Sequence, residues 1–112
     1  MALEHNIGID LGGTKIECIV LENRKEIFRD RVFTESEKGS DHIINQIHKI
    51  YQKAVLFLGN KKHTLGICTP GSISPETDLL RNSNTTCLNG HPFKKILEDK
   101  LDHSLSIEND AN

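Results

Sequence analysis

The sequence predicts an α/β domain in which a three-stranded antiparallel meander is followed by βαβ elements. Two observations favour this fold class. Apolar residues alternate with other residues over much of the first 34 positions, as they do in half-buried strands. From residue 41 the apolar spacing becomes helical, and further strand-like and helix-like segments then follow in turn. We therefore expect a mixed sheet flanked by helices.

The first two strands are predicted on either side of a glycine turn. Three apolar residues alternate before Gly12-Gly13 and three alternate after it: Ile7, Ile9, Leu11, Ile16, Cys18 and Val20. Two alternating runs joined by a tight glycine turn are typical of a β-hairpin. Beyond a polar stretch, residues 26–34 carry four more apolar residues and predict the third strand of the meander.

The most regular helical pattern begins near Asp41. Apolar side chains recur at helical spacing up to Leu58, and Gly59-Asn60 supplies a stop signal. The sequence therefore predicts a long amphipathic helix over this stretch. A short β-type run follows at residues 64–68.

The remaining third of the chain predicts a long loop, a second helix and a last strand. Residues 69–89 are rich in Pro, Gly, Ser, Thr and Asn, and long loops in compact domains are often functional. Pro92 suits the first turn of a helix whose apolar face then repeats. Residues 105–108 read as a strand, with Asn109-Asp110 at its end.

Composition limits the function classes. A chain of 112 residues with 36% hydrophobic and 27% charged residues suits one soluble globular domain. A net charge of −2 gives no positive electrostatic field that would attract polyanions, so we expect no nucleic-acid partner. The longest apolar run, residues 54–58, is too short for a membrane span, and no signal-peptide pattern precedes it; we expect a cytoplasmic protein.

Cysteine and histidine spacing predicts neither a disulfide framework nor a zinc site. The three cysteines are odd in number and have no CxxC spacing: Cys18, Cys68 and Cys87. The six histidines form no metal-binding pattern: His5, His42, His48, His63, His91 and His103. Reduced thiols and structural imidazoles are the expectation.

The glycine turn has the features of a phosphate-binding loop. Gly12 and Gly13 permit backbone conformations closed to other residues and let main-chain N–H groups approach anionic oxygens. Thr14 and Lys15 add a hydroxyl donor and a positive charge, and Asp10 could orient a Mg²⁺ ion through water. The order of Thr14 and Lys15 excludes a Walker loop, and GxGxxG is absent. A simple two-glycine hairpin with a solvated Asp and Lys is the alternative.

Residues 10–15 resemble the first phosphate motif of sugar kinases of the ROK family, within the actin-like and hexokinase-like ATPases. Three further segments follow in the order and spacing of the N-terminal lobe of these kinases: 69–74, 81–90 and 108–112. The resemblance implies a ribonuclease H-like lobe over residues 1–112, with the C-terminal lobe absent from this chain. The region of residues 71–74 and 84–86 looks most like the bacterial fructokinase and manno(fructo)kinase branch.

This resemblance also implies roles for individual residues. Asp110 occupies the place of the catalytic base that accepts the proton of the sugar hydroxyl, and it would also contact the sugar. The alternative is an N-cap aspartate that only starts a helix. Four further residues would line the sugar side of the cleft, although each taken singly is more often a turn residue: Gly71, Ser72, Asn84 and Asn109.

The implied reaction is ATP-dependent, Mg²⁺-assisted phosphorylation of a hexose hydroxyl of the fructose, mannose or glucose type, at carbon six. Asp10, Gly12, Gly13, Thr14 and Lys15 would hold ATP and its Mg²⁺. Zinc and the rest of the sugar site are expected only in the second lobe, so we expect little turnover from this chain alone. The family implies homo-oligomers. A DNA-binding repressor is disfavoured because no segment for a helix-turn-helix precedes Ile7. The alternative is a non-catalytic or truncated ROK-type sugar-binding or interaction domain.

Overall fold

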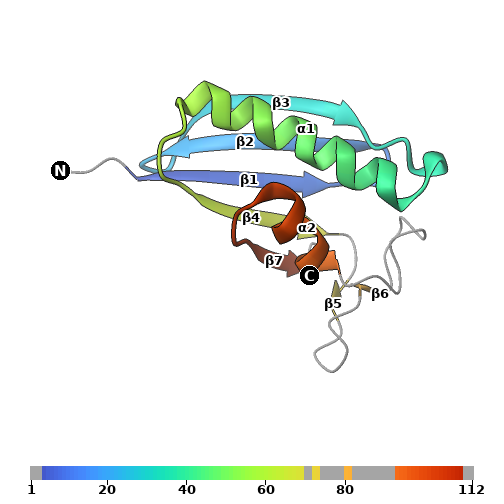
Figure 1. Ribbon diagram of the computed structural model, residues 1–112. Helices are drawn as coiled ribbons and strands as arrows, with labels where there is room; N and C mark the ends of the chain where they lie inside the picture. Colours follow the sequence, from blue (N-terminus) through green and yellow to red (C-terminus); the bar gives the residue numbers. More distant parts are fainter. Residues whose placement is uncertain (1–3, 70–71, 74–79, 82–92, 110–112) are drawn as a thin grey trace.

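A computed structural model describes residues 4–69, 72–73, 80–81 and 93–109 (Figure 1). One five-stranded sheet has the order β3-β2-β1-β4-β7. Its strands are β1 (His5–Leu11), β2 (Lys15–Glu22), β3 (Lys25–Phe33), β4 (Thr64–Thr69) and β7 (Ser106–Asn109). The helices are the 3₁₀ turn η1 (Ser36–Lys38), α1 (Ser40–Leu58) and α2 (Phe93–Leu101). The predicted α/β class with a mixed sheet flanked by helices is confirmed.

The predicted meander forms the first half of this sheet. β1 pairs antiparallel with β2 from His5 opposite Glu22 to Leu11 opposite Ile16, and β2 pairs antiparallel with β3. The predicted segment 26–34 corresponds to β3, which begins one residue earlier and ends before Thr34. All three predicted strands are therefore present, with shifts of one residue or so at their ends.

The helices α1 and α2 cover the same face of the sheet (Figure 1). The side chains of α1 that face the strands are fully buried because the apolar spacing places them on one side of the helix. They pack against the alternate residues of β1, β2 and β4 in a single core: Ile7, Ile9, Leu11, Ile16, Cys18, Val20, Ile43, Ile47, Ile50, Ala54 and Ile67. Leu97 and Leu101 of α2 belong to the same core.

The predicted stop signal ends α1. Gly59 adopts a left-handed φ of 66°, and its N–H donates to the carbonyl of Leu56 at 3.1 Å. The N–H of Asn60 donates to the carbonyl of Val55, also at 3.1 Å. These bonds satisfy carbonyls that the last helical turn leaves open, which is why a glycine is favoured there.

The long loop predicted over residues 69–89 is wrong in part, because it contains two short paired strands. β5 (Ser72–Ile73) and β6 (Leu80–Arg81) form an antiparallel ladder of their own. Hydrogen bonds between two short extended segments can form wherever the chain doubles back, and their Pro, Gly, Ser and Asn content hides them from pattern reading. Pro92 lies outside the described residues, and α2 begins at Phe93.

Three parallel strands end at one edge of the sheet. β1 pairs parallel with β4, and β4 pairs parallel with β7. The registers place Asp10 beside Cys68, and Cys68 beside Glu108. The turn after β1 and the end of β7 therefore lie at the same edge, two strand spacings or about 10 Å apart.

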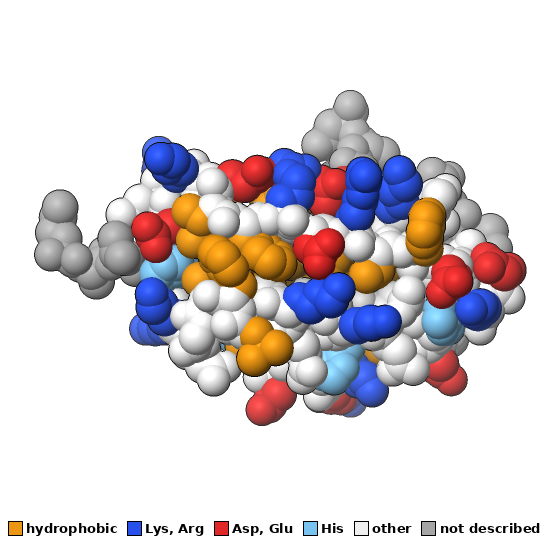
Figure 2. Space-filling model, turned by 90° about the horizontal axis from the view of Figure 1, so that it is seen from above, with side chains coloured by type: hydrophobic (Ala, Val, Ile, Leu, Met, Phe, Trp, Pro, Cys, Tyr) orange, Lys and Arg blue, Asp and Glu red, His pale blue; other side chains and the backbone are white. Residues whose placement is uncertain are grey.

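The surface carries mixed charge and some exposed apolar groups. Figure 2 shows Lys and Arg side chains interspersed with Asp and Glu, beside a group of hydrophobic side chains. Among the residues whose side chains the structure describes, the exposed large hydrophobic ones are Phe33, Leu56 and Phe57, and Phe57 also contacts the ring of Phe28 at 4.8 Å between centroids. Neither α1 nor α2 is long and apolar enough to cross a membrane, and these are the α-helices of the described part of the chain.

Candidate functional site

The glycine turn is closed tightly by its own backbone. The N–H of Gly12 donates to the carbonyl of Lys15 at 2.9 Å. A Cβ atom at Gly12 would lie 2.8 Å from that same carbonyl oxygen, closer than a side chain can approach backbone. Glycine is therefore required at position 12 by the close approach of two chain segments.

The sequence predicted unusual backbone conformations at both glycines, and the structure gives a different reason. Neither Gly12 nor Gly13 adopts a φ in the left-handed region, which among the described glycines is found at Gly39 and Gly59. No heavy atom lies within 4 Å of a Cβ built at Gly13. Gly12 thus serves a steric role within the turn, whereas the space beside Gly13 is open.

A threonine after β3 fixes the shape of this turn. Thr34 is completely buried, although it is polar. Its hydroxyl donates to the carbonyl of Gly12 at 2.8 Å, and its backbone N–H donates to the carbonyl of Thr14 at 2.8 Å. Sequence reasoning assigned no role to Thr34, because its partners lie about 20 residues earlier in the chain.

The open side of the turn presents N–H groups to solvent. Gly13, Thr14 and Lys15 are exposed. The N–H groups of Gly13 and Thr14 have no hydrogen-bond acceptor among the described residues. Such exposed amides, with the hydroxyl of Thr14 and the ammonium group of Lys15 next to them, are the donors that an anionic phosphate oxygen accepts from. The predicted phosphate-binding residues therefore meet at one place.

A hollow of about 410 Å³ lies beside the turn and is lined by Gly13, Thr14, Phe33, Glu35, Ser36 and Glu37. Glu35 would bring negative charge close to a bound anion. Its carboxylate is paired with His42 Nε2 at 2.9 Å and with Lys38 Nζ at 3.3 Å. The hydrogen bond from His42, followed by that from Lys38, lowers the pKa of Glu35. Lys38 and a protonated His42 would offset this carboxylate near the turn.

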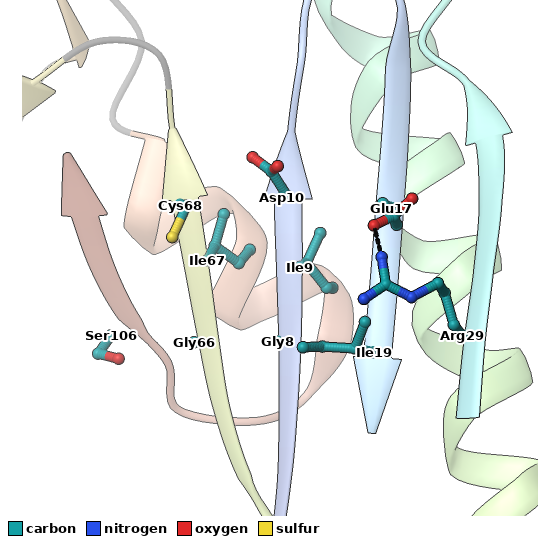
Figure 3. A pocket seen from close by; sticks show the side chains of 10 residues that line it. All are labelled: Gly8, Ile9, Asp10, Glu17, Ile19, Arg29, Gly66, Ile67, Cys68 and Ser106. Carbon is teal, nitrogen blue, oxygen red and sulfur yellow. Dashed lines mark hydrogen bonds and ion pairs between the residues drawn. The ribbon is translucent and has the colours of Figure 1, made fainter. Parts of the chain in front are cut away.

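Asp10 opens onto a second hollow, on the sheet face opposite the helices (Figure 3). This cavity of about 330 Å³ lies over Gly8 and Gly66, which are register partners in β1 and β4 and leave the sheet bare of side chains there. Glu17, the register partner of Asp10 in β2, forms an ion pair with Arg29 of β3. The carboxylate of Asp10 therefore lies at the carboxyl end of β1, beside a compensated charge pair.

These residues fit a Mg²⁺–nucleotide complex. Mg²⁺ in such sites keeps several waters and is held by one or two carboxylates together with substrate phosphates. Asp10 is an exposed carboxylate at the end of β1, and the turn that follows it presents exposed donors that could bind a phosphate group. Within the described ranges, no group of three or more His, Cys, Asp or Glu side chains is arranged to hold a metal ion by itself.

The residues predicted on the sugar side are placed only in part. Ser72 begins β5, and Asn109 ends β7 at the edge where the glycine turn also lies. Gly71, Asn84 and Asp110 lie outside the described residues. Asp110 directly follows Asn109, so the strand that leads to it ends at this edge. Their roles stay predictions.

Comparison with solved structures defines the class of this fold. The chain is 26% identical to a ROK hexokinase from Thermus thermophilus, with a TM-score of 0.78 over 96% of this chain and 36% of that chain. A ROK family glucokinase from Streptomyces griseus, solved with glucose and AMPPNP, has the same fold at 24% identity and a TM-score of 0.76, over 99% of this chain and 34% of that chain. The chain therefore has the fold of about a third of such kinases.

Sequence comparison then gives the family. The model of the ROK family matches residues 6–112, and the chain belongs to this family. An N-acetyl-D-glucosamine kinase from Histophilus somni is 35% identical over 106 residues, which are 94% of this chain and 34% of the relative. The chain thus spans about a third of the length of its curated relatives. The expected ROK resemblance is confirmed, whereas these relatives do not single out the fructokinase branch.

Proposed function

We propose that this chain provides the nucleotide-phosphate loop and the catalytic base of an ATP-dependent kinase that phosphorylates the hydroxyl of a hexose or N-acetylhexosamine. The names of the related enzymes favour N-acetyl-D-glucosamine as the sugar. The motif resemblance favoured fructose, mannose or glucose instead, so these sugars are the competing substrates. We place the reaction at the 6-hydroxyl and in the cytoplasm.

One observation supports this proposal most directly: the exposed amides of the glycine turn and the end of β7 lie at the same edge of the sheet. Phosphoryl transfer needs donors on the phosphates and a group that accepts the proton of the attacking hydroxyl. Gly13, Thr14 and Lys15 supply the donors, and Asp10 would hold Mg²⁺ through water; the bound ion would supply positive charge next to the phosphates. Asp110, after β7, accepts the proton.

The proposal is tested in a chimera, because the relatives are about three times as long as this chain. Residues 6–112 replace the corresponding region of the Histophilus somni enzyme, and ADP release is measured with each of the four sugars. We expect turnover that is highest with N-acetyl-D-glucosamine. Asp110→Asn in the chimera should lower kcat by at least about 100-fold, because it removes the general base.

Asp99→Asn is the matched control, since it makes the same change at an exposed carboxylate on α2, remote from the edge. Its kcat should equal that of the unmodified chimera. A folded chimera in which both variants retain full turnover would refute the role of Asp110. A folded chimera that neither hydrolyses ATP nor transfers its phosphoryl group to any of the four sugars would refute the kinase proposal for this chain.

A further inference from the structure

We propose that Thr34 is a positioning residue that aims the N–H groups of the glycine turn at the nucleotide phosphates. This inference rests on the proposed function, because it concerns the same phosphate loop. It adds a residue that touches no ligand but determines how well the loop is organised before a ligand arrives.

Burial shows that Thr34 is committed to the turn. Its side chain has no exposed surface, and a buried hydroxyl without a partner would destabilise the fold. Both of its donors go to the same loop: the hydroxyl to the carbonyl of Gly12 and the N–H to the carbonyl of Thr14, each at 2.8 Å. Two bonds to carbonyls two residues apart fix the orientation of two peptide groups.

Peptide geometry turns these bonds into an orientation of donors. In a planar trans peptide group the C=O and the N–H point in opposite directions. Because the carbonyl of Gly12 points at Thr34, the N–H of Gly13 points away from it. The carbonyl of Thr14 likewise points at Thr34, so the peptide groups on both sides of the Gly13-Thr14 bond are held in place. Thr34 thus holds the carbonyl oxygens, which would repel a phosphate, on the protein side of the turn.

Thr34 is itself anchored by the long helix. The carbonyl of Phe33, the preceding residue, accepts a hydrogen bond from Gln46 Nε2 of α1 at 2.7 Å. The end of β3 is therefore fixed to α1, and Thr34 transmits this fixed position to the turn. Donors that are oriented in advance cost less free energy to order on binding, so a phosphate should bind more tightly than it would to a loose loop.

The test compares nucleotide affinity in two variants of the 112-residue chain. Backbone amide shifts are followed in ¹⁵N-labelled protein during titration with MgATP, with AMP as a ligand lacking the β- and γ-phosphates. We expect the amides of Gly13 and Thr14 to respond to MgATP and much less to AMP. Thr34→Val keeps the shape of the side chain but removes its hydroxyl donor, and should lower the affinity for MgATP about tenfold. Thr34→Ser restores the donor and should bind within about twofold of the unmodified chain.

A control separates positioning from stability. Ile50→Val removes one methylene group from a fully buried side chain of α1 and destabilises the core without touching the turn. Its MgATP affinity should be unchanged at a temperature where every variant is folded. If Thr34→Val binds MgATP as tightly as the unmodified chain, or if Ile50→Val weakens it equally, the positioning role is refuted while the phosphate loop stands. If the unmodified turn does not respond to MgATP, the proposed function itself is refuted.

Discussion

Replacing each glycine of the turn by alanine should have opposite effects on stability. A methyl group at position 12 would lie 2.8 Å from the carbonyl oxygen of Lys15, whereas one at position 13 would meet no heavy atom within 4 Å. The carbonyl of Lys15 is held by its bond to the N–H of Gly12, so it cannot retreat without opening the turn. Gly12→Ala should therefore destabilise the fold, and Gly13→Ala should not.

The magnitudes follow from the two environments. Relieving the contact at Gly12 requires the turn to open by several tenths of an ångström, and overpacking of this kind costs about 1–3 kcal/mol. Gly13 keeps a φ outside the left-handed region, so alanine fits there and reduces the entropy of the unfolded chain. That effect stabilises by about 0.4–1 kcal/mol. The two variants should differ by at least about 1.4 kcal/mol.

Urea unfolding followed by circular dichroism measures this difference. With an m-value of about 1–3 kcal/mol/M for a protein of this size, the midpoints should be separated by roughly 0.5 M or more. Equal midpoints, or a lower midpoint for Gly13→Ala, would refute the steric interpretation of the turn. The same variants report on the ligand, because a methyl group at Gly13 lies where a phosphate oxygen would approach. Gly13→Ala should therefore lower the affinity for MgATP, although this variant remains stably folded.

Two further predictions concern the core. Ile47→Ala leaves a cavity at a fully buried position of α1 and should destabilise the fold by about 2–5 kcal/mol. Leu56→Ala, at a side chain 77% exposed on the same helix, should change the free energy of unfolding by no more than about 0.5 kcal/mol. Similar urea midpoints for the two variants would contradict the observed helix face. Burial, and secondarily the charge of Asp30, raises the pKa of Cys18 from 9.0 to about 12. The neutral thiol thus stabilises the fold fully below pH 9, and this stability should be lost between about pH 9 and 12 at about 1.4 kcal/mol per pH unit. Cys18→Ala should lack this part of the slope in urea unfolding from pH 8 to 11; parallel curves for the two proteins would contradict it.

Local signals made the elements predictable. The helix expected up to Leu58 is observed as Ser40–Leu58, because a 3.6-residue apolar spacing and a C-terminal glycine act within a few residues of each other. The hairpin was predictable for the same reason, since alternation on both sides of Gly12-Gly13 requires only a turn between them. The position of Asp10 at the end of β1 followed from this hairpin.

Contacts between distant segments could not be predicted in the same way. Thr34 contacts Gly12 and Thr14 because β3 returns beside β2, and no local pattern distinguishes this threonine from one that ends an ordinary strand. The different roles of Gly12 and Gly13 also depend on where the carbonyl of Lys15 lies after folding. A phosphate loop can thus be suspected from composition, but the groups that shape it become visible only once the sheet is assembled.

The charges at the turn predict that this chain binds a nucleotide but catalyses little phosphoryl transfer by itself. Lys15 brings one positive charge to the loop, whereas Glu37 adds negative charge to the adjoining hollow, where Glu35 is paired with Lys38 and His42. Phosphoryl transfer spreads negative charge over oxygens on several sides of the transferring group, and a turn on one side neutralises only part of it. MgATP binding by the isolated chain should therefore weaken with added salt, and ADP release should stay near the uncatalysed rate with any of the four sugars. Robust turnover by the isolated chain would show that the described edge of the sheet is a sufficient active site.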